Sequence, residues 1–171
     1  MKNFKYILPA AMLVFASCSP TTRPAEDNVA KTDVAADTTV AEKALIAKLS
    51  IKDTIKTGES IQLKFTVYNN ADSVQQFCKW HTPFEPWISK YLDIKDENGV
   101  EVSYKGAMAK RIMPPPADSY LKVQPKDSVA AEADLLKGYA ITNPGKYTVV
   151  YNSQNVSGLS VKDSVTFVYS K

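Results

Sequence analysis

Short segments in which apolar and polar residues alternate recur from about residue 45 to the end of the chain. The clearest lies at residues 60–67 and has apolar side chains at every second position, namely Ile61, Leu63, Phe65 and Val67. Because successive side chains point to opposite faces of a β-strand, this pattern predicts a strand with one buried face. Strands are also predicted at residues 45–51, 91–95, 100–104, 129–135, 146–151 and 164–169.

Turn signals separate the predicted strands. The connection at residues 56–59 is short and contains Gly58, and the connection at residues 96–99 ends in Asn98-Gly99, a pair that supplies the positive φ angles of a tight turn. Both connections predict hairpins. Seven or eight strands within residues 43–171, with no convincing helix between them, predict an all-β domain with an immunoglobulin-like antiparallel β-sandwich.

Tyr147 follows the turn glycine Gly145 by two residues and precedes the core position Val149 by two. This is the spacing of the tyrosine corner of immunoglobulin-like domains, in which a tyrosine hydroxyl bonds back to the backbone. The spacing predicts a structural role for Tyr147. The alternative is a half-buried strand tyrosine in another sandwich or in a small barrel.

The first 18 residues have the features of a secretory signal. Lys2 and Lys5 precede an apolar run of about ten residues, roughly half the length that spans a bilayer. The run ends in Phe15-Ala16-Ser17-Cys18, which resembles the bacterial lipobox, although leucine is commoner than phenylalanine at its first position. We predict a lipoprotein signal peptide at residues 1–17 and acylation of Cys18. The alternative is an ordinary signal peptide with an accidental cysteine.

Residues 18–42 are predicted to tether the domain at residues 43–171 to a membrane. They contain no aromatic residue and few large apolar ones, so they cannot bury enough surface to fold. We expect a flexible linker, with a marginal helix in its alanine-rich half as the alternative. Because two or three acyl chains hold a protein on a bilayer permanently, we expect a lipid-anchored protein of the bacterial cell envelope, on the outer membrane and facing the periplasm or the surface.

Composition argues against several classes of function. The chain carries 21 basic and 18 acidic residues, and its net charge of +3 falls to +1 without the signal peptide. Nucleic acid is therefore not an expected partner. One histidine and two cysteines are too few for ordinary zinc sites, so no metal and no cofactor are expected. His81 and Glu85 have the spacing of a helical metal pair, but Pro83 and Pro86 disfavour a helix there.

A series of short motifs resembles a known domain over roughly residues 45–151. The motifs are residues 78–85 (CKWHTPFE), residues 104–111 (YKGAMAKR), Asp118-Ser119-Tyr120, Asp134-Leu135, Tyr139 and Gly145-Lys146-Tyr147. In this order they resemble the β-rich amino-terminal domain of zinc endopeptidases of the deuterolysin and peptidyl-Lys type. The chain lacks the HExxH helix that supplies two zinc ligands and the base in such enzymes. The resemblance therefore implies an accessory or pro-domain-like module, and neither catalytic residues nor proteolysis are expected.

Two segments depart from the strand pattern and form the expected binding surface. The loop at residues 82–87 supplies Thr82, Pro83, Phe84, Glu85 and Trp87, and the segment at residues 105–116 supplies Lys105, Lys110, Arg111, Pro114 and Pro115. The three consecutive prolines predict an extended polyproline-type stretch. As alternatives, the loop only fixes the crossing between two strands, with Glu85 bound to backbone donors, Lys110 or Arg111, and the segment is a solvated edge strand protected from aggregation.

Trp80 and Cys78 share one strand parity and are both expected in the core. Trp80 resembles the tryptophan in the middle of an immunoglobulin-like sandwich. With Cys18 acylated, Cys78 has no disulfide partner in the chain, so we expect a buried, reduced thiol. A catalytic role for Cys78 would need His81 as its base, and the two lie too close along one strand to converge.

These patterns predict a membrane-anchored lipoprotein with a non-enzymatic, protein-binding β-sandwich module. The expected partners are membrane lipid, through acylated Cys18, and a second protein, with a protease as one candidate. The alternatives are a regulator or inhibitor of an extracytoplasmic protease, such as a metalloprotease, and a structural envelope protein.

Overall fold

The computed structural model describes residues 44–171, so the predicted signal peptide (residues 1–17), acylated Cys18 and linker (residues 18–42) lie outside the described residues. The strands of the described part are β1 (Leu45–Ser50), β2 (Thr54–Lys56), β3 (Gln62–Asn69), β4 (Gln75–Cys78), β5 (Leu92–Asp96), β6 (Tyr120–Val123), β7 (Ser128–Asp134), β8 (Gly145–Tyr151) and β9 (Val165–Ser170). Three short helices accompany them, η1 (Ala117–Ser119), α1 (Leu135–Gly138) and α2 (Gln154–Ser157). Within residues 44–171, no helix has the length and apolar character needed to cross a membrane.

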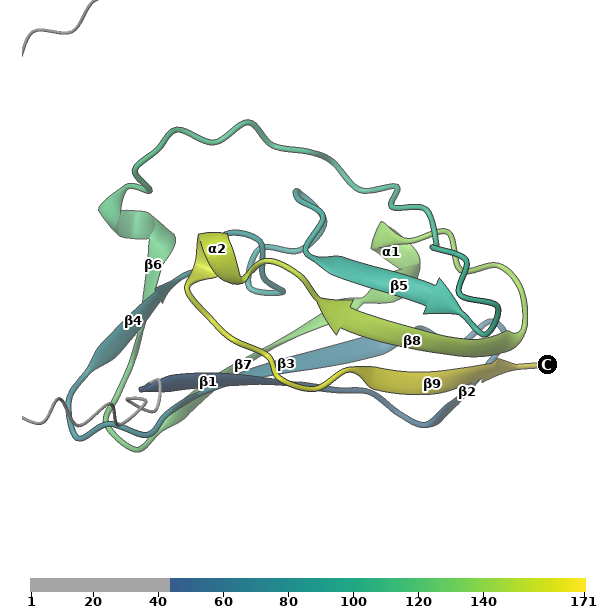
Figure 1. Cartoon of the computed structure of the whole chain (residues 1–171), viewed down its shortest axis with the longest axis horizontal. Helices are drawn as coiled ribbons and strands as arrows, with labels where there is room; N and C mark the ends of the chain where they lie inside the picture. The colour runs from purple at the N-terminus through teal and green to yellow at the C-terminus, as the bar shows by residue number, and fades with distance from the viewer. Residues whose placement is uncertain (1–43) are drawn as a thin grey trace, which may run out of the picture. The chain divides into compact units, whose positions relative to one another are not determined.

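The strands form two main sheets and a small ribbon. One sheet has the order β1-β3-β7, the other has the order β2-β9-β8-β5, and β4 pairs with β6 in the ribbon (Figure 1). All pairs are antiparallel except β2 with β9. The predicted immunoglobulin-like β-sandwich is confirmed, with nine strands in the described residues where seven or eight were expected.

The core lies between the two main sheets and follows the predicted alternation. In β3, Leu63, Phe65 and Val67 are fully buried, while Gln62 and Lys64 are exposed. The opposite sheet contributes every second residue of its central strands, namely Tyr147, Val149 and Tyr151 of β8 and Phe167 and Tyr169 of β9. Burial of these two facing rows supplies the main driving force for the fold.

Tyr147 makes the contact that defines a tyrosine corner. Its side chain is 5% exposed, its ring stacks on Phe167, and its hydroxyl donates a 2.7 Å hydrogen bond to the carbonyl oxygen of Asn143, four residues upstream. The hydrogen bond joins the start of β8 to the turn that precedes it.

The connection between β1 and β3 is longer than the predicted hairpin. These strands do pair in antiparallel register, and Gly58 has the expected positive φ of 97°. Between them, however, β2 crosses to the other sheet and runs parallel to β9. The crossing is stabilised by burial of Ile55, the middle residue of β2, which is 2% exposed, and by backbone hydrogen bonds to β9.

The predicted strand at residues 100–104 is wrong. The turn after β5 has Gly99 at φ 78°, but only one bridge follows, between Lys95 and Glu101. The chain then leaves β5, and Tyr104 pairs instead with Tyr139, with the ring centroids 5.3 Å apart. Aromatic packing on Tyr139 has replaced the continuation of the hairpin.

Asn69, at the end of β3, positions the β4–β6 ribbon. Its side chain is 1% exposed, and its Nδ2 lies within 3.0 Å of the carbonyl oxygens of Ser73, Val123 and Gln124. Its Oδ1 accepts a hydrogen bond from the N–H of Ala71. One buried amide thus joins the turns that lead into β4 and out of β6, and a buried amide with satisfied hydrogen bonds holds such turns firmly.

Candidate functional site

The loop at residues 82–87 is built around the Thr82 side chain. Thr82 is fully buried; its Oγ1 donates to the carbonyl oxygen of Lys79 and accepts from the N–H of Phe84. His81, just before the loop, and Trp87, its last residue, have positive φ angles of 56° and 61°. Such angles are uncommon for residues other than glycine, so the loop has a backbone shape that the surrounding contacts impose.

Part of the predicted binding loop belongs to the core. Thr82 and Pro83 are buried, and the ring of Phe84 packs against Phe65 and Phe77 at centroid distances of 6.4 and 5.3 Å. Thr82 and Pro83 are therefore not available to a partner, and Phe84 is partly buried. Core packing and turn formation therefore explain why the loop contains these residues.

Trp87 is the centre of an aromatic cluster. Its ring stacks on Tyr91 at 5.6 Å and meets Tyr139 edge-on at 5.8 Å. Gly138, at the end of α1, lies so close that a Cβ atom there would be 2.1 Å from the Cε3 atom of Trp87. Similarly, a Cβ on Gly106 would be 2.7 Å from the carbonyl oxygen of Trp87. Both glycines are needed because backbone approaches this tryptophan from two sides.

The expectation that Trp80 and Cys78 are buried is confirmed, but neither side chain belongs to the main cluster between the two sheets. In β4 the side chain of Phe77 enters the core cluster, and Cys78 and Trp80 have the opposite parity. Trp80 is 5% exposed but lies outside that cluster, and its ring is covered by the Arg111 guanidinium, with Cζ 4.7 Å from the ring centroid. The tryptophan is buried by a charged side chain, which is a cation–π contact.

Arg111 also forms an ion pair with Glu85, through Nη2 and Oε2. Lys110 and Arg111 were the predicted cationic partners of Glu85, and the structure shows the contact with Arg111. The side chains of both residues are about one-fifth exposed, at 20% and 21%, so the pair is partly shielded from water. This contact joins the two segments that were predicted to form the binding surface.

We call residues 105–116 the strap. Figure 1 shows it between β5 and β6, running across the top of the domain to η1. At its start, the N–H of Lys105 donates to the carbonyl oxygen of Gly138, and the N–H groups of Ala107 and Ala109 donate to those of Trp87 and Ile88 at 2.8 and 2.9 Å. The strap is therefore bonded to the domain over its first half, and the Arg111–Glu85 pair holds its middle.

The strap is not the edge strand that was considered as an alternative, because none of its residues pairs in a sheet. In the proline run, Pro116 has the polyproline-type φ of −66° and ψ of 160°. The chain bends at residues 113 and 114, where the Met113–Pro114 peptide bond is cis, and η1 begins at Ala117.

The strap carries three strongly exposed apolar side chains. Ile112 is 83% exposed, Met108 70% and Met113 67%, more than any other large apolar side chain of residues 44–171. Lys105 and Lys110 are exposed beside them, and the strap contains no acidic residue. The sequence interpretation included the lysines and prolines but missed these apolar residues. Their signal was the presence of three long apolar side chains in a segment that is not predicted to be a strand.

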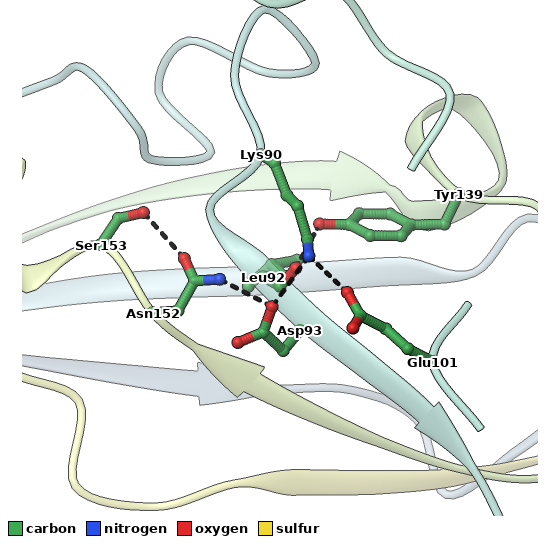
Figure 2. A network of polar contacts seen from close by, with 7 residues as sticks. All are labelled: Lys90, Leu92, Asp93, Glu101, Tyr139, Asn152 and Ser153. Carbon is green, nitrogen blue, oxygen red and sulfur yellow. Dashed lines mark hydrogen bonds and ion pairs between the residues drawn. The ribbon is translucent and has the colours of Figure 1, made fainter. Parts of the chain in front are cut away.

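A polar network lies at the start of β5 (Figure 2). The ammonium group of Lys90 contacts the carboxylates of Asp93 and Glu101, and hydrogen bonds to these groups raise its pKa. Asn152 donates to Asp93 at 2.8 Å and accepts from Ser153. Every charged group of the network has an opposite charge next to it, so the arrangement joins β5, the following turn and the end of β8.

The chemical groups near Arg111 are poorly suited to nucleophilic chemistry. Burial raises the pKa of the Cys78 thiol, and burial together with Arg111 lowers the pKa of His81. The thiol is therefore kept protonated, and a protonated thiol is a weak nucleophile. Within residues 44–171, no group of three or more His, Cys, Asp and Glu residues is placed to hold a metal ion.

The sheet order and the tyrosine corner agree with a comparison of the sequence with known families. The model of the immunoglobulin-like domain family matches residues 48–157. The chain belongs to the immunoglobulin-like domain family. The immunoglobulin-like match starts within β1 and ends with α2, and it contains both the loop at residues 82–87 and the strap. No curated protein matches the chain significantly. The resemblance to a peptidase accessory domain has no support beyond the β-rich fold and stays a prediction.

Proposed function

We propose that the chain is a lipid-anchored protein of the bacterial cell envelope whose immunoglobulin-like domain binds another protein through the strap, without catalysing a reaction. The anchor is the predicted acylated Cys18, which lies outside the described residues. The observation that carries the proposal is the gathering of the three most exposed large apolar side chains of the domain, Met108, Ile112 and Met113, on one segment. Exposed apolar side chains that gather on one part of a surface mark interaction sites.

The anchoring of the strap favours recognition over chance exposure. A free loop with three exposed apolar side chains would lose much conformational entropy on binding, which weakens affinity. Here the hydrogen bonds of Ala107 and Ala109 and the ion pair of Arg111 already hold the backbone. A partner therefore meets a surface that is ordered before contact, and little ordering remains to oppose binding.

The experiment compares two triple variants of the full-length lipoprotein. Met108→Ser, Ile112→Ser and Met113→Ser together remove the apolar surface of the strap. The matched control changes three exposed valines elsewhere, Val100→Ser, Val150→Ser and Val168→Ser, which are 61%, 45% and 41% exposed. Each protein is cross-linked in intact envelopes, and the captured proteins are identified by mass spectrometry.

We expect a defined partner that the wild-type protein and the valine control capture and the strap variant does not. Capture of the same partner by all three proteins would contradict a role of the strap. Absence of any specific partner would favour the alternative of a purely structural envelope protein.

A further inference from the structure

Residues 107–112 have two different sides. On the inner side, the backbone N–H groups of Ala107 and Ala109 bond to the domain, and the Arg111 side chain lies over Trp80. Met108, Lys110 and Ile112 are exposed, and so are Ala107 and Ala109, while Arg111 is partly buried. The N–H groups that bond to the domain belong to every second residue, which is the backbone pattern of an extended strand, so the segment presents its side chains as an extended peptide does.

The outer backbone edge of this segment is unpaired. The N–H groups of Met108 and Lys110 make no hydrogen bond within residues 44–171, and the Lys110 ammonium group has no carboxylate partner there. An extended segment with a free edge and exposed side chains fits partners that bind peptides as added strands. Because the charge of Lys110 has no partner within residues 44–171, it would be complemented by a carboxylate in the partner's cleft.

We propose that the strap is a substrate-like inhibitor of serine endopeptidases whose specificity pocket contains a carboxylate, with Lys110 as the residue that enters the pocket. This inference rests on the proposed function, because it names the class of protein that the strap binds. Serine endopeptidases of this kind accept a lysine because an aspartate at the bottom of the pocket meets the ammonium group.

The anchors on both sides of the Lys110–Arg111 peptide bond explain inhibition in place of rapid cleavage. When the protease serine attacks the Lys110 carbonyl carbon, the bond to the Arg111 nitrogen breaks, and the histidine of the protease gives that nitrogen a proton. Arg111 stays in position, because Glu85 and Trp80 hold its side chain. Its new amino group then returns the proton to the histidine and attacks the acyl ester, so the peptide bond forms again and the serine is released. Because the amino group of Arg111 is held next to the acyl ester, its effective concentration is very high. Re-formation of the peptide bond is therefore faster than hydrolysis of the ester by water.

The test uses pancreatic trypsin as the probe and the full-length lipoprotein in detergent. The rate of hydrolysis of a chromogenic lysine peptide is measured at increasing lipoprotein concentration. We expect inhibition that is weakened by about 100-fold or more in Lys110→Ala, because the charge pair in the pocket is lost. Lys122→Ala, a change of an exposed lysine outside the strap, is the control and leaves inhibition unchanged.

A second variant tests the role of the anchor. Glu85→Gln removes the charge that holds Arg111, and we expect it to convert the inhibitor into a substrate that is cut between Lys110 and Arg111, as mass spectrometry would show. Unchanged circular dichroism of each variant verifies that the fold is retained. Lack of trypsin inhibition by the wild-type protein, or its rapid cleavage at Lys110, would overturn the inference. The cross-linking experiment is independent: a strap-dependent partner that is no protease would leave the proposed function standing and the inhibitor inference wrong.

Discussion

Gly138 has no room for even one methyl group, because Trp87 lies against it. We expect Gly138→Ala to lower the free energy of unfolding by about 1–3 kcal/mol, since either the tryptophan or the end of α1 has to move. Urea denaturation followed by tryptophan fluorescence measures the loss. Lys137→Ala, an exposed change in the same helix, should stay within about 0.5 kcal/mol of wild type. Equal stabilities of the two variants would show that Trp87 is not tightly packed on α1.

Tyr151 makes stability depend on alkaline pH. Burial raises its pKa from 10.0 to about 12, and the Ser157 hydroxyl, 2.7 Å away, opposes part of that rise. Because the folded pKa lies above the unfolded one, the stabilisation is complete below pH 10 and is lost as the pH rises towards 12. Burial also raises the pKa of Tyr91 and Tyr139, so their ionisation opposes folding in the same direction.

The expected result is a two-step rise of tyrosinate absorbance at 295 nm. Exposed tyrosines ionise first, and the buried ones ionise together with loss of the β-sheet circular dichroism signal. In Tyr151→Phe one raised pKa is absent, so the free energy of unfolding should fall less steeply above pH 10. Complete tyrosinate absorbance at pH 10 with an intact fold would contradict the burial of these side chains.

Among the elements, the strap is attached beyond Ala109 through the Arg111 side chain, which pairs with Glu85 and lies over Trp80. We expect Arg111→Met to increase the amide hydrogen exchange rates of Ala107 and Ala109 by about tenfold or more, because a partly buried pair is lost and the strap opens more often. Glu59→Gln is the matched control, since its pair with Lys52 is mostly exposed and contributes little. Unchanged exchange at both alanines in Arg111→Met would mean that the backbone hydrogen bonds hold the strap without the ion pair.

The elements that the sequence predicts well are those of five or more residues. β1, β3, β5, β7, β8 and β9 lie where the pattern placed them, because one face of each strand packs towards the core, partly exposed in β7. β2, β4 and β6 have only three or four residues, too few for a period to be visible. Their positions depend on distant contacts, such as the burial of Ile55 and the hydrogen bonds of Asn69.

The sequence indicated the loop at residues 82–87 and the strap separately, because both depart from the strand pattern. It did not indicate that the two segments contact each other. Nothing in the sequence indicates that Arg111 reaches back to Glu85 and Trp80, since this contact depends on the path of the strap in three dimensions. For the same reason the surroundings of the two tryptophans were not predictable. Trp80 is buried as expected, but it lies beneath Arg111 and outside the main cluster, and Trp87 is partly buried in the aromatic cluster.

For the whole molecule, the proposed function requires that the domain be tethered to a membrane. Lipidation is predicted from the signal and lipobox-like pattern alone, so it is tested on the two cysteines of the chain, Cys18 and Cys78. In cells given labelled palmitate, we expect the wild-type chain to take up the label and to partition into detergent, because two or three acyl chains bind a bilayer far more strongly than one.

Cys18→Ser should abolish incorporation of the label, because the serine hydroxyl cannot form the thioether. Cys78→Ser is the matched control, since it makes the same chemical change at a thiol that is 2% exposed, and it should keep full incorporation. Label retained in Cys18→Ser would contradict the anchor. The strap would then have to find its partner by free diffusion. With the anchor, the partner is met at the membrane, where tethering raises the effective concentration and a modest affinity of the strap is sufficient.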